Sequence, residues 1–218
     1  THAAKLLRVW YLDEATRMNP HLKYGQAVPG RTEGRGIGII DTTGLINVIE
    51  TAGMLEASAA WTPADQEGLK EWFSGYLDWL LTHPHGKAER GERNNHGTWY
   101  DVQVVSFALF CGRDDIAREI LDDVPKTRID KHFMPDGSQP HELARTRSYP
   151  YSVMNLRGFF HLAAFAEKLG IDLWNYQSED GRSIRKGLDW IVEHAFGSGE
   201  WEHRNMAPIT PGPVLPLL

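Results

Sequence analysis

Cysteine is almost absent from this sequence, since Cys111 is the only one in 218 residues. An internal disulfide bond is therefore excluded, and the apolar helical run around Cys111 predicts a buried thiol that behaves as a small hydrophobic side chain. Long hydrophobic runs are absent as well, because no apolar stretch reaches the roughly 18 residues that a membrane-spanning helix needs. The chain also lacks a block of basic residues and has a formal net charge of −6, which argues against a nucleic-acid-binding protein.

An alternating polar and apolar pattern, the sign of half-buried strands, is also missing. The apolar residues instead follow a helical period and predict helices near residues 3–18, 45–59, 63–81, 98–111, 116–124, 151–169 and 184–195. The expected caps and stops are, in chain order, Thr42 or Thr43, Thr62-Pro63, Gly112, Pro125 and Gly170. The sequence therefore predicts an all-α protein whose antiparallel helical hairpins form an α/α toroid, incomplete because a closed toroid needs more helices.

Long polar loops are expected at residues 19–41, 82–93 and 126–148. Loops of more than about 15 residues in a compact domain are usually functional or disordered, so we expect the functional side chains there. A helical domain should cover residues 1–206. It is followed by a tail, residues 207–218, whose prolines favour an extended arm over a helix.

The polar segment at residues 94–100 combines two side-chain amides, an imidazole and two aromatic rings. Asn95 and His96 can hydrogen-bond a carboxylate, and Trp99 or Tyr100 can lie against a sugar ring. The simpler interpretation of the segment is a helix N-cap, because asparagine is favoured at that position.

A second polar segment, residues 141–156, places histidine, arginine and tyrosine side chains just before another apolar helix. With residues 94–100 and 19–30, it resembles the alginate lyase family, the helical-toroid polysaccharide lyases that act on alginate and related polyuronates such as glucuronan. That family pairs an Asn-Asn-His segment with a downstream Glu-Leu-x-Arg stretch and a tyrosine that begins a helix. The resemblance covers roughly residues 18–165 and implies that the chain is a fragment of a longer catalytic domain.

The resemblance implies a lyase that cleaves a uronate-containing polymer by β-elimination. Asn95, His96 and Arg145 would neutralise the C6 carboxylate, where negative charge develops as the C5 proton leaves. Tyr151 would transfer the proton, because a tyrosine can act as base and acid when cations lower its pKa from about 10. His96 is an alternative base. The implied substrate-binding residues are Gln26, Arg31, Asn94, Trp99, Tyr100, His141, Arg147 and Tyr149.

The assignment of Tyr151 has a competitor, because the spacing from Arg145 is one residue shorter than in the family and Pro150 precedes the tyrosine. Tyr149, with Arg147, can take the same role. Two other functions also remain open. One is a glycoside hydrolase, which would use two carboxylates among Asp41, Asp101, Asp136 and Glu142. The other is a non-catalytic polysaccharide-binding domain.

The histidines outside these segments give no metal site. His83-Pro84-His85 has no usual ligand spacing, His132 and His141 are expected in a loop, and His161 on a buried helix face. We therefore expect no metal and no cofactor, an anionic polysaccharide as the partner, and neither nucleic acid nor a membrane. A periplasmic or secreted location is expected, with an export signal upstream of the first residue.

Overall fold

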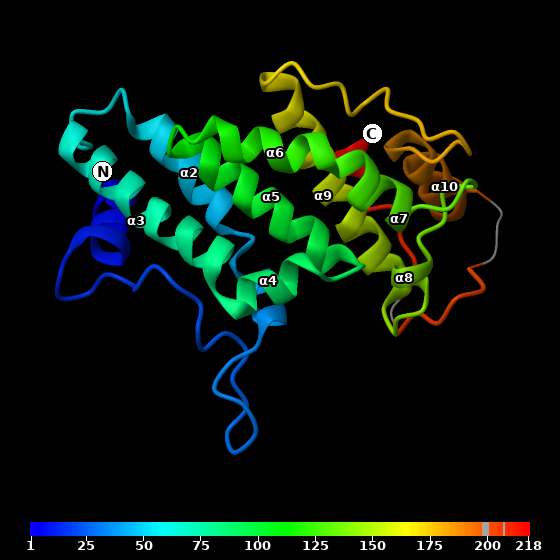
Figure 1. Cartoon of the computed structure of the whole chain (residues 1–218), viewed down its shortest axis with the longest axis horizontal. Helices are drawn as coiled ribbons and strands as arrows, with labels where there is room; N and C mark the ends of the chain where they lie inside the picture. Colours follow the sequence, from blue (N-terminus) through cyan, green and yellow to red (C-terminus); the bar gives the residue numbers. More distant parts are fainter. Residues whose placement is uncertain (198–200, 207) are drawn as a thin grey trace. The chain divides into compact units, whose positions relative to one another are not determined.

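The computed structural model describes residues 1–197, 201–206 and 208–218, which form helices and loops without a β-strand (Figure 1). The α-helices are α1 (His2–Leu7), α2 (Leu45–Leu55), α3 (Pro63–Thr82), α4 (Pro84–Arg90), α5 (Asn95–Phe110), α6 (Asp114–Val124), α7 (Asp130–His132), α8 (Pro140–Leu143), α9 (Ser148–Lys168) and α10 (Ile184–Phe196). Short π-helical turns occupy Arg8–Leu12 and Pro125–Ile129, and 3₁₀ turns occupy Gly36–Thr42 and Leu215–Leu217. The prediction of an all-α protein is confirmed. None of the helices in the described ranges is long and apolar enough to cross a bilayer.

The chain divides into two compact units. Unit 1 comprises residues 1–89 and 106–117, and unit 2 comprises residues 90–105 and 118–218. One boundary falls within α5, so the first turns of this helix belong to unit 2 and its last turn to unit 1, and another falls within α6. The described part of the proline-rich tail belongs to unit 2, together with both polar segments singled out in the sequence.

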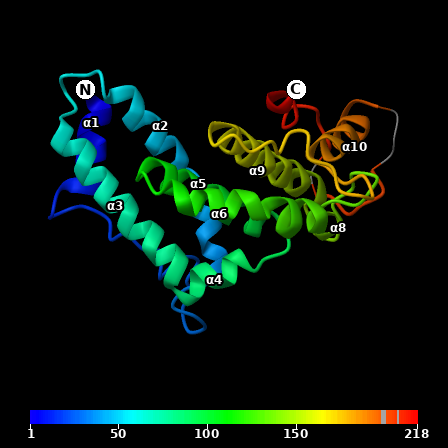
Figure 2. The same cartoon turned by 45° about the horizontal axis from the view of Figure 1, so that its top comes forward.

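Unit 1 is built around α3, which is the longest helix of this unit. Thr62 caps this helix as expected and forms a capping box with Asp65. The apolar stripe of α3 is fully buried at Leu69, Phe73 and Leu77. In Figure 2, α1 and the turn that follows it lie beside α3, and this turn packs against it.

Unit 2 is built around α9, which buries residues along most of its length. The helices α8 and α10 both pack against it. In its core, Phe133 packs against Phe159 with ring centroids 4.8 Å apart. A Cβ atom on Gly187 would lie 2.2 Å from the ring of Phe133, so this position of α10 accepts only glycine without movement of the core.

Several helix boundaries differ from the prediction. The first helix ends at Leu12 instead of Met18. Thr42 and Thr43 do not cap α2, because Thr42 lies in the preceding 3₁₀ turn and its hydroxyl donates to the Ile39 carbonyl. The expected loop at residues 82–93 contains α4.

Pro125 does not stop the fifth predicted helix. The chain continues from α6 through the π turn Pro125–Ile129 into α7. Proline lacks the N–H that an α-helical hydrogen bond needs and clashes with the preceding turn, and a wider π turn accommodates both effects. As a result His132 lies in α7. His141 lies in the separate short helix α8, so the prediction that both are loop residues is wrong.

The tail is more ordered than an extended arm. Val214 is buried, and residues 215–217 form a 3₁₀ turn. The Tyr149 hydroxyl donates to the Thr210 carbonyl over 2.7 Å. The prediction of an extended arm is wrong for residues 215–217, because Pro216 can occupy the first turn of a helix, where no backbone N–H is required. Ala207 lies outside the described residues.

Candidate active site

The two asparagines at the start of α5 make different contacts. Asn94 is the N-cap, because its side-chain oxygen accepts a hydrogen bond from the His96 backbone N–H over 3.0 Å. The simpler interpretation of the motif is thus confirmed for this residue. Asn95 is the first helical residue and is 1 % exposed. Its side chain is therefore held inside the protein by something other than capping.

Glu142 holds Asn95. Its carboxylate, in α8, accepts hydrogen bonds from the backbone N–H of Asn95 and from the Asn95 side-chain amide, the latter over 2.9 Å. The backbone bond satisfies one of the N–H groups that a helix leaves unpaired at its start, where the helix dipole also favours an anion. Glu142 therefore fixes the orientation of the Asn95 amide from 47 residues away.

The same carboxylate holds Arg145. The Arg145 guanidinium donates to Glu142 over 3.1 Å, and its carbon lies 3.6 Å from the centroid of the Tyr151 ring. These contacts connect Asn95, Glu142, Arg145 and Tyr151 in one continuous cluster, which we call the Glu142 cluster. It unites the two polar segments of the sequence and includes His96 as the neighbour of Asn95 along α5.

Charge and burial compete at Glu142, whose side chain is 1 % exposed, compared with 27 % for Arg145. Burial raises the pKa of Glu142, and the hydrogen bonds from Asn95 and Arg145 oppose this rise. Among the described residues, the Arg145 guanidinium donates to one acceptor, the Glu142 carboxylate. Arg145 thus keeps most of its donors for a ligand.

A second buried ion pair fixes the chain just before Asn94. Arg128 donates to both carboxylate oxygens of Asp101, over 2.6 and 3.2 Å. It also donates to the carbonyls of Glu92 and Arg90, over 3.1 and 2.8 Å. Burial raises the pKa of Asp101, and the Arg128 charge opposes the rise. We call this group the Arg128 clamp.

Gly97 is required by the Arg128 clamp. A Cβ atom at this position would lie 2.2 Å from the Glu92 carbonyl oxygen and 2.5 Å from the nearest guanidinium nitrogen of Arg128. The glycine of the sequence motif therefore allows α5 to approach the clamp closely. This close approach sets where the first turn of α5, with Asn95 and His96, begins.

Behind the first turn of α5 lies a buried hydrogen-bond network. The Thr98 hydroxyl donates to the Asn155 side-chain oxygen over 2.6 Å, and its oxygen lies 3.1 Å from Nδ1 of His132. Since the single hydroxyl proton is used on Asn155, the His132 ring is left to donate to Thr98. His132 is 2 % exposed, and burial lowers its pKa to about 3.

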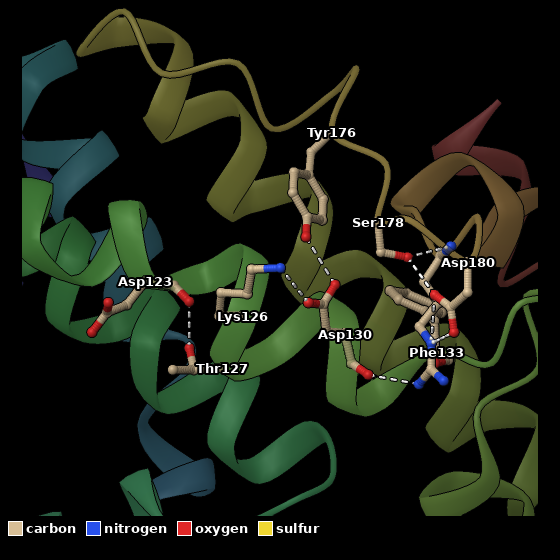
Figure 3. Close-up of polar contacts among 9 residues, drawn as sticks. Asp123, Lys126, Thr127, Asp130, Phe133, Tyr176, Ser178 and Asp180 are labelled. Carbon is tan, nitrogen blue, oxygen red and sulfur yellow. Dashed lines mark hydrogen bonds and ion pairs between the residues drawn. The ribbon is translucent and has the colours of Figure 1, made fainter.

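The segment that carries Arg128 and His132 is tied to the loop after α9. Figure 3 shows Lys126 and Tyr176 converging on the Asp130 carboxylate, to which they donate over 3.1 and 2.9 Å. Arg182 donates to the backbone carbonyls of Asp130 and Phe133. A cation at these carbonyls satisfies acceptors that a helix leaves unpaired at its end. The helix α7 is therefore held through the Asp130 side chain and through its backbone.

Three aromatic residues predicted to bind substrate lie inside unit 2. Trp99 is 8 % exposed, Tyr100 1 % and Tyr149 2 %. The Trp99 indole donates to the Met154 carbonyl, and the Tyr149 hydroxyl to Thr210. Burial raises the pKa of both tyrosines. Their positions make them supports of the site, because a buried ring offers no face to a sugar.

The other residues predicted to bind substrate are more accessible. His141 and Arg147 are exposed in unit 2, close in sequence to the Glu142 cluster. Gln26 and Arg31 lie in unit 1. Arg31 is exposed, and the Gln26 side chain donates to Asp41 and accepts from Arg35, each over 3.2 Å.

The site predicted from sequence leaves out Glu142, which contacts both Asn95 and Arg145 in the structure. It was considered only as one acid of a hydrolase pair. The usable signal was its place in the Glu-Leu-x-Arg stretch, because residues three apart on a helix are neighbours and can pair. In the part of the chain that the structure describes, histidine, cysteine and carboxylate side chains form no group of three that could hold a metal ion.

Comparison with solved structures shows the fold class of the chain. An alginate lyase from Bacteroides ovatus superposes with a TM-score of 0.89 at 38 % sequence identity, covering 94 % of this chain and 55 % of that protein. Alginate lyase A1-III with a bound tetrasaccharide matches with a TM-score of 0.57 at 19 % identity, covering 79 % of this chain and 52 % of that one. The predicted α/α-toroid class is confirmed by these matches.

The sequence matches the alginate lyase family over residues 1–201. The chain belongs to this family, and the resemblance found in its polar segments is confirmed. It spans little more than half the length of the Bacteroides ovatus structure, 55 %. No curated protein sequence matches it.

Proposed function

We propose that this chain contributes the active site of a polysaccharide lyase that cleaves a uronate-containing polymer, of alginate or glucuronan type, by β-elimination. The observation that carries the proposal is the Glu142 cluster. It brings an amide, a guanidinium and a phenol together from two sequence segments about 50 residues apart, with an imidazole next to the amide. Family membership supports the same reaction.

The reaction needs fixed positive charge and hydrogen-bond donors at the substrate carboxylate. When the C5 proton leaves, negative charge spreads onto the C6 carboxylate, and donors aimed at this position lower the barrier most. Arg145 provides a planar fork of donors that can bind a carboxylate through two parallel bonds. Asn95 and His96 add the further donors, and Glu142 acts through both Asn95 and Arg145 as a positioning residue.

Tyr151 transfers the proton in this proposal. Its ring is half-buried, and the Arg145 guanidinium lies against its face. Proton removal from C5, formation of the C4–C5 double bond and departure of the C4 oxygen are coupled, and the departing oxygen takes up a proton. Tyr151 can perform both transfers in turn, whereas in the alternative scheme His96 takes the C5 proton and Tyr151 protonates the leaving oxygen.

Tyr149 is less suited to the role. Its hydroxyl is committed to the Thr210 carbonyl over 2.7 Å, and its ring is 2 % exposed. Two of the four acids considered for a hydrolase are also less well placed, since Asp101 is paired with Arg128 and Glu142 with Asn95 and Arg145. An inverting hydrolase needs one carboxylate that can act on water.

The reaction products test the proposal. The chain is incubated with alginate, polymannuronate, polyguluronate and glucuronan, and the near-ultraviolet absorbance of the unsaturated sugar is followed. We expect absorbance to rise with at least one of them. New reducing ends without absorbance would establish a hydrolase, and binding without cleavage would establish a polysaccharide-binding domain. We also propose a periplasmic or secreted location, because a polyuronate chain is too large to cross a membrane unaided.

A further inference from the structure

Unit 2 contains a polar cavity next to the first turn of α5. Its volume is about 340 Å³, which is at the lower end of the roughly 300–1,000 Å³ typical of small-molecule sites. The stretch before α5, the side of α6, the π turn and α7 form its walls. The lining residues that matter here are Arg90, Glu92, Arg93, Asp123, Arg128 and Lys131.

The cations of this cavity fall into two kinds. Arg128 is 6 % exposed and is occupied by Asp101 and by backbone carbonyls. The side chains of Arg90, Arg93 and Lys131 are exposed, and none of them forms an ion pair with another described residue. The cavity is thus lined by three long exposed cationic side chains and by the buried Arg128 clamp.

Acceptors are present among these cations. The carboxylates of Glu92 and Asp123 belong to the lining, and the Thr127 hydroxyl, which also lines the cavity, donates to the Asp123 carbonyl. A small inorganic anion needs donors only and would be repelled by carboxylates. A sugar acid suits the mixed lining better, because its carboxylate meets the cations while its hydroxyl groups donate to Glu92 and Asp123.

We propose that this cavity is a second binding site for a uronate unit, separate from the Glu142 cluster. The ligand class rests on the proposed function, since the polymer supplies many uronate units. Arg93 is two residues before Asn95, so their Cα atoms are at most about 7.6 Å apart. A polymer held at the Glu142 cluster therefore has neighbouring uronate units within reach of the cavity.

The test uses paired variants and a binding readout that is independent of turnover. Arg90→Gln and Lys131→Gln are combined, because these changes remove the charges and leave the backbone carbonyl that Arg128 uses. The matched control is Lys126→Gln, which removes an exposed lysine paired with Asp130 that does not line the cavity. Affinity for a uronate oligosaccharide, for its carboxyl-reduced counterpart and for inorganic phosphate is measured by calorimetric titration.

We expect the double variant to bind the uronate oligosaccharide about two- to thirtyfold more weakly, since each exposed ion pair contributes about 0.2–1 kcal/mol. The control and the carboxyl-reduced ligand should show no such loss. Unchanged affinity in the double variant, or the same loss with the reduced ligand, overturns the inference. Phosphate binding that depends on these residues while the uronate does not bind there also overturns it.

The inference and the proposed function fail differently. If the wild-type chain yields no unsaturated product but binds the uronate oligosaccharide through Arg90 and Lys131, the lyase proposal fails and the second site stands. If product forms and the double variant retains full affinity for the oligosaccharide, the lyase stands and the second site fails.

Discussion

Unit 2 contains two buried carboxylate–arginine pairs that look alike in composition and differ in what they leave accessible. In the Arg128 clamp, the Arg128 and Asp101 side chains are 8 % and 4 % exposed. In the Glu142 cluster, the carboxylate is 1 % exposed and Arg145 is 27 % exposed. The first guanidinium is enclosed and the second reaches the surface.

The partners of the two arginines explain the difference. Arg128 uses its donors on Asp101 and on the carbonyls of Arg90 and Glu92, so it joins three stretches of chain and has little left for a ligand. Arg145 has one hydrogen bond to Glu142, and its flat face covers Tyr151. A buried pair whose donors are nearly all satisfied stabilises a local structure, whereas a pair with spare donors beside a phenol can act on a substrate.

The largest expected effect follows from removing the phenol beside Arg145. Tyr151→Phe keeps the ring and its contact with the guanidinium, so folding and binding should survive. Formation of unsaturated product from a polyuronate should fall about a hundred- to ten-thousand-fold, the usual contribution of a general acid–base group. Initial rates and substrate binding are measured on the same preparation.

Tyr149→Phe is the matched control. It removes a hydroxyl that donates to the Thr210 carbonyl and should reduce stability slightly while leaving most activity. If Tyr149→Phe abolishes product formation and Tyr151→Phe does not, the alignment through the shortened Arg-to-Tyr spacing is wrong. If both variants keep full activity, the lyase mechanism through either tyrosine is refuted.

The second prediction breaks the Arg128 clamp. Arg128→Met leaves Asp101 buried without its cation, which should lower the free energy of unfolding by about 3–5 kcal/mol. Arg113→Met is the control, because the Arg113–Asp78 pair is exposed and such pairs contribute only about 0–1 kcal/mol. Urea unfolding measures both. A loss in Arg128→Met no greater than in the control would show that the clamp is not structural.

The third prediction concerns the accessible arginine. Arg145→Ala should lower turnover on a polyuronate about a hundred- to a thousandfold, as expected for loss of one electrostatic donor at a developing charge. Its effect on the free energy of unfolding should be smaller than that of Arg128→Met, because Arg145 is partly exposed. Unimpaired turnover, or equal activity of the wild type on a carboxyl-reduced polymer, would contradict the proposed role.

Local signals explain how much of this fold could be predicted from sequence. The apolar period of α3, its Thr62-Pro63 start and the glycine after α5 act within one or two turns, and each gave the correct helix end or nearly so. Pro125 was misread because its usual effect is also local, and a π turn that the surrounding packing stabilises overrides it. The rule that proline ends a helix fails where tertiary contacts determine the backbone conformation.

The candidate site depends on contacts between residues far apart in the sequence, and no local pattern predicts such contacts. The family motif predicts Asn95, Arg145 and Tyr151 as site residues, and the structure connects them through contacts. The connecting residue, Glu142, lies 47 positions from Asn95, so only the folded chain shows what it holds. Arg128 had no signal at all, because its hydrogen bonds to backbone carbonyls 36 and 38 residues away depend on no particular side chain there.

The smallest expected effect is a pH dependence next to the Arg128 clamp. His132 has a folded pKa of about 3, compared with 6.5 for a free histidine. Below pH 6.5 the unfolded chain binds a proton at His132, whereas His132 of the folded chain stays neutral until the pH approaches 3. The stability that neutral His132 contributes is therefore lost as the pH falls from 6.5 towards 3. Between pH 7 and 4.5 this amounts to about 2–3 kcal/mol.

His132→Gln should remove this dependence, because glutamine does not titrate and its amide can still donate to Thr98. Glu142 changes stability with pH in the opposite direction, since its raised pKa makes folding take up a proton as the pH falls. The wild type and the variant must therefore be compared at each pH. His141→Gln is the control, because His141 is exposed. Urea unfolding at pH 7 and 4.5 should show a loss that is about 2–3 kcal/mol smaller in His132→Gln than in the wild type and in the control. Equal losses in all three proteins would mean that His132 becomes protonated without cost, and that the network joining it to Thr98 and Asn155 is open to water.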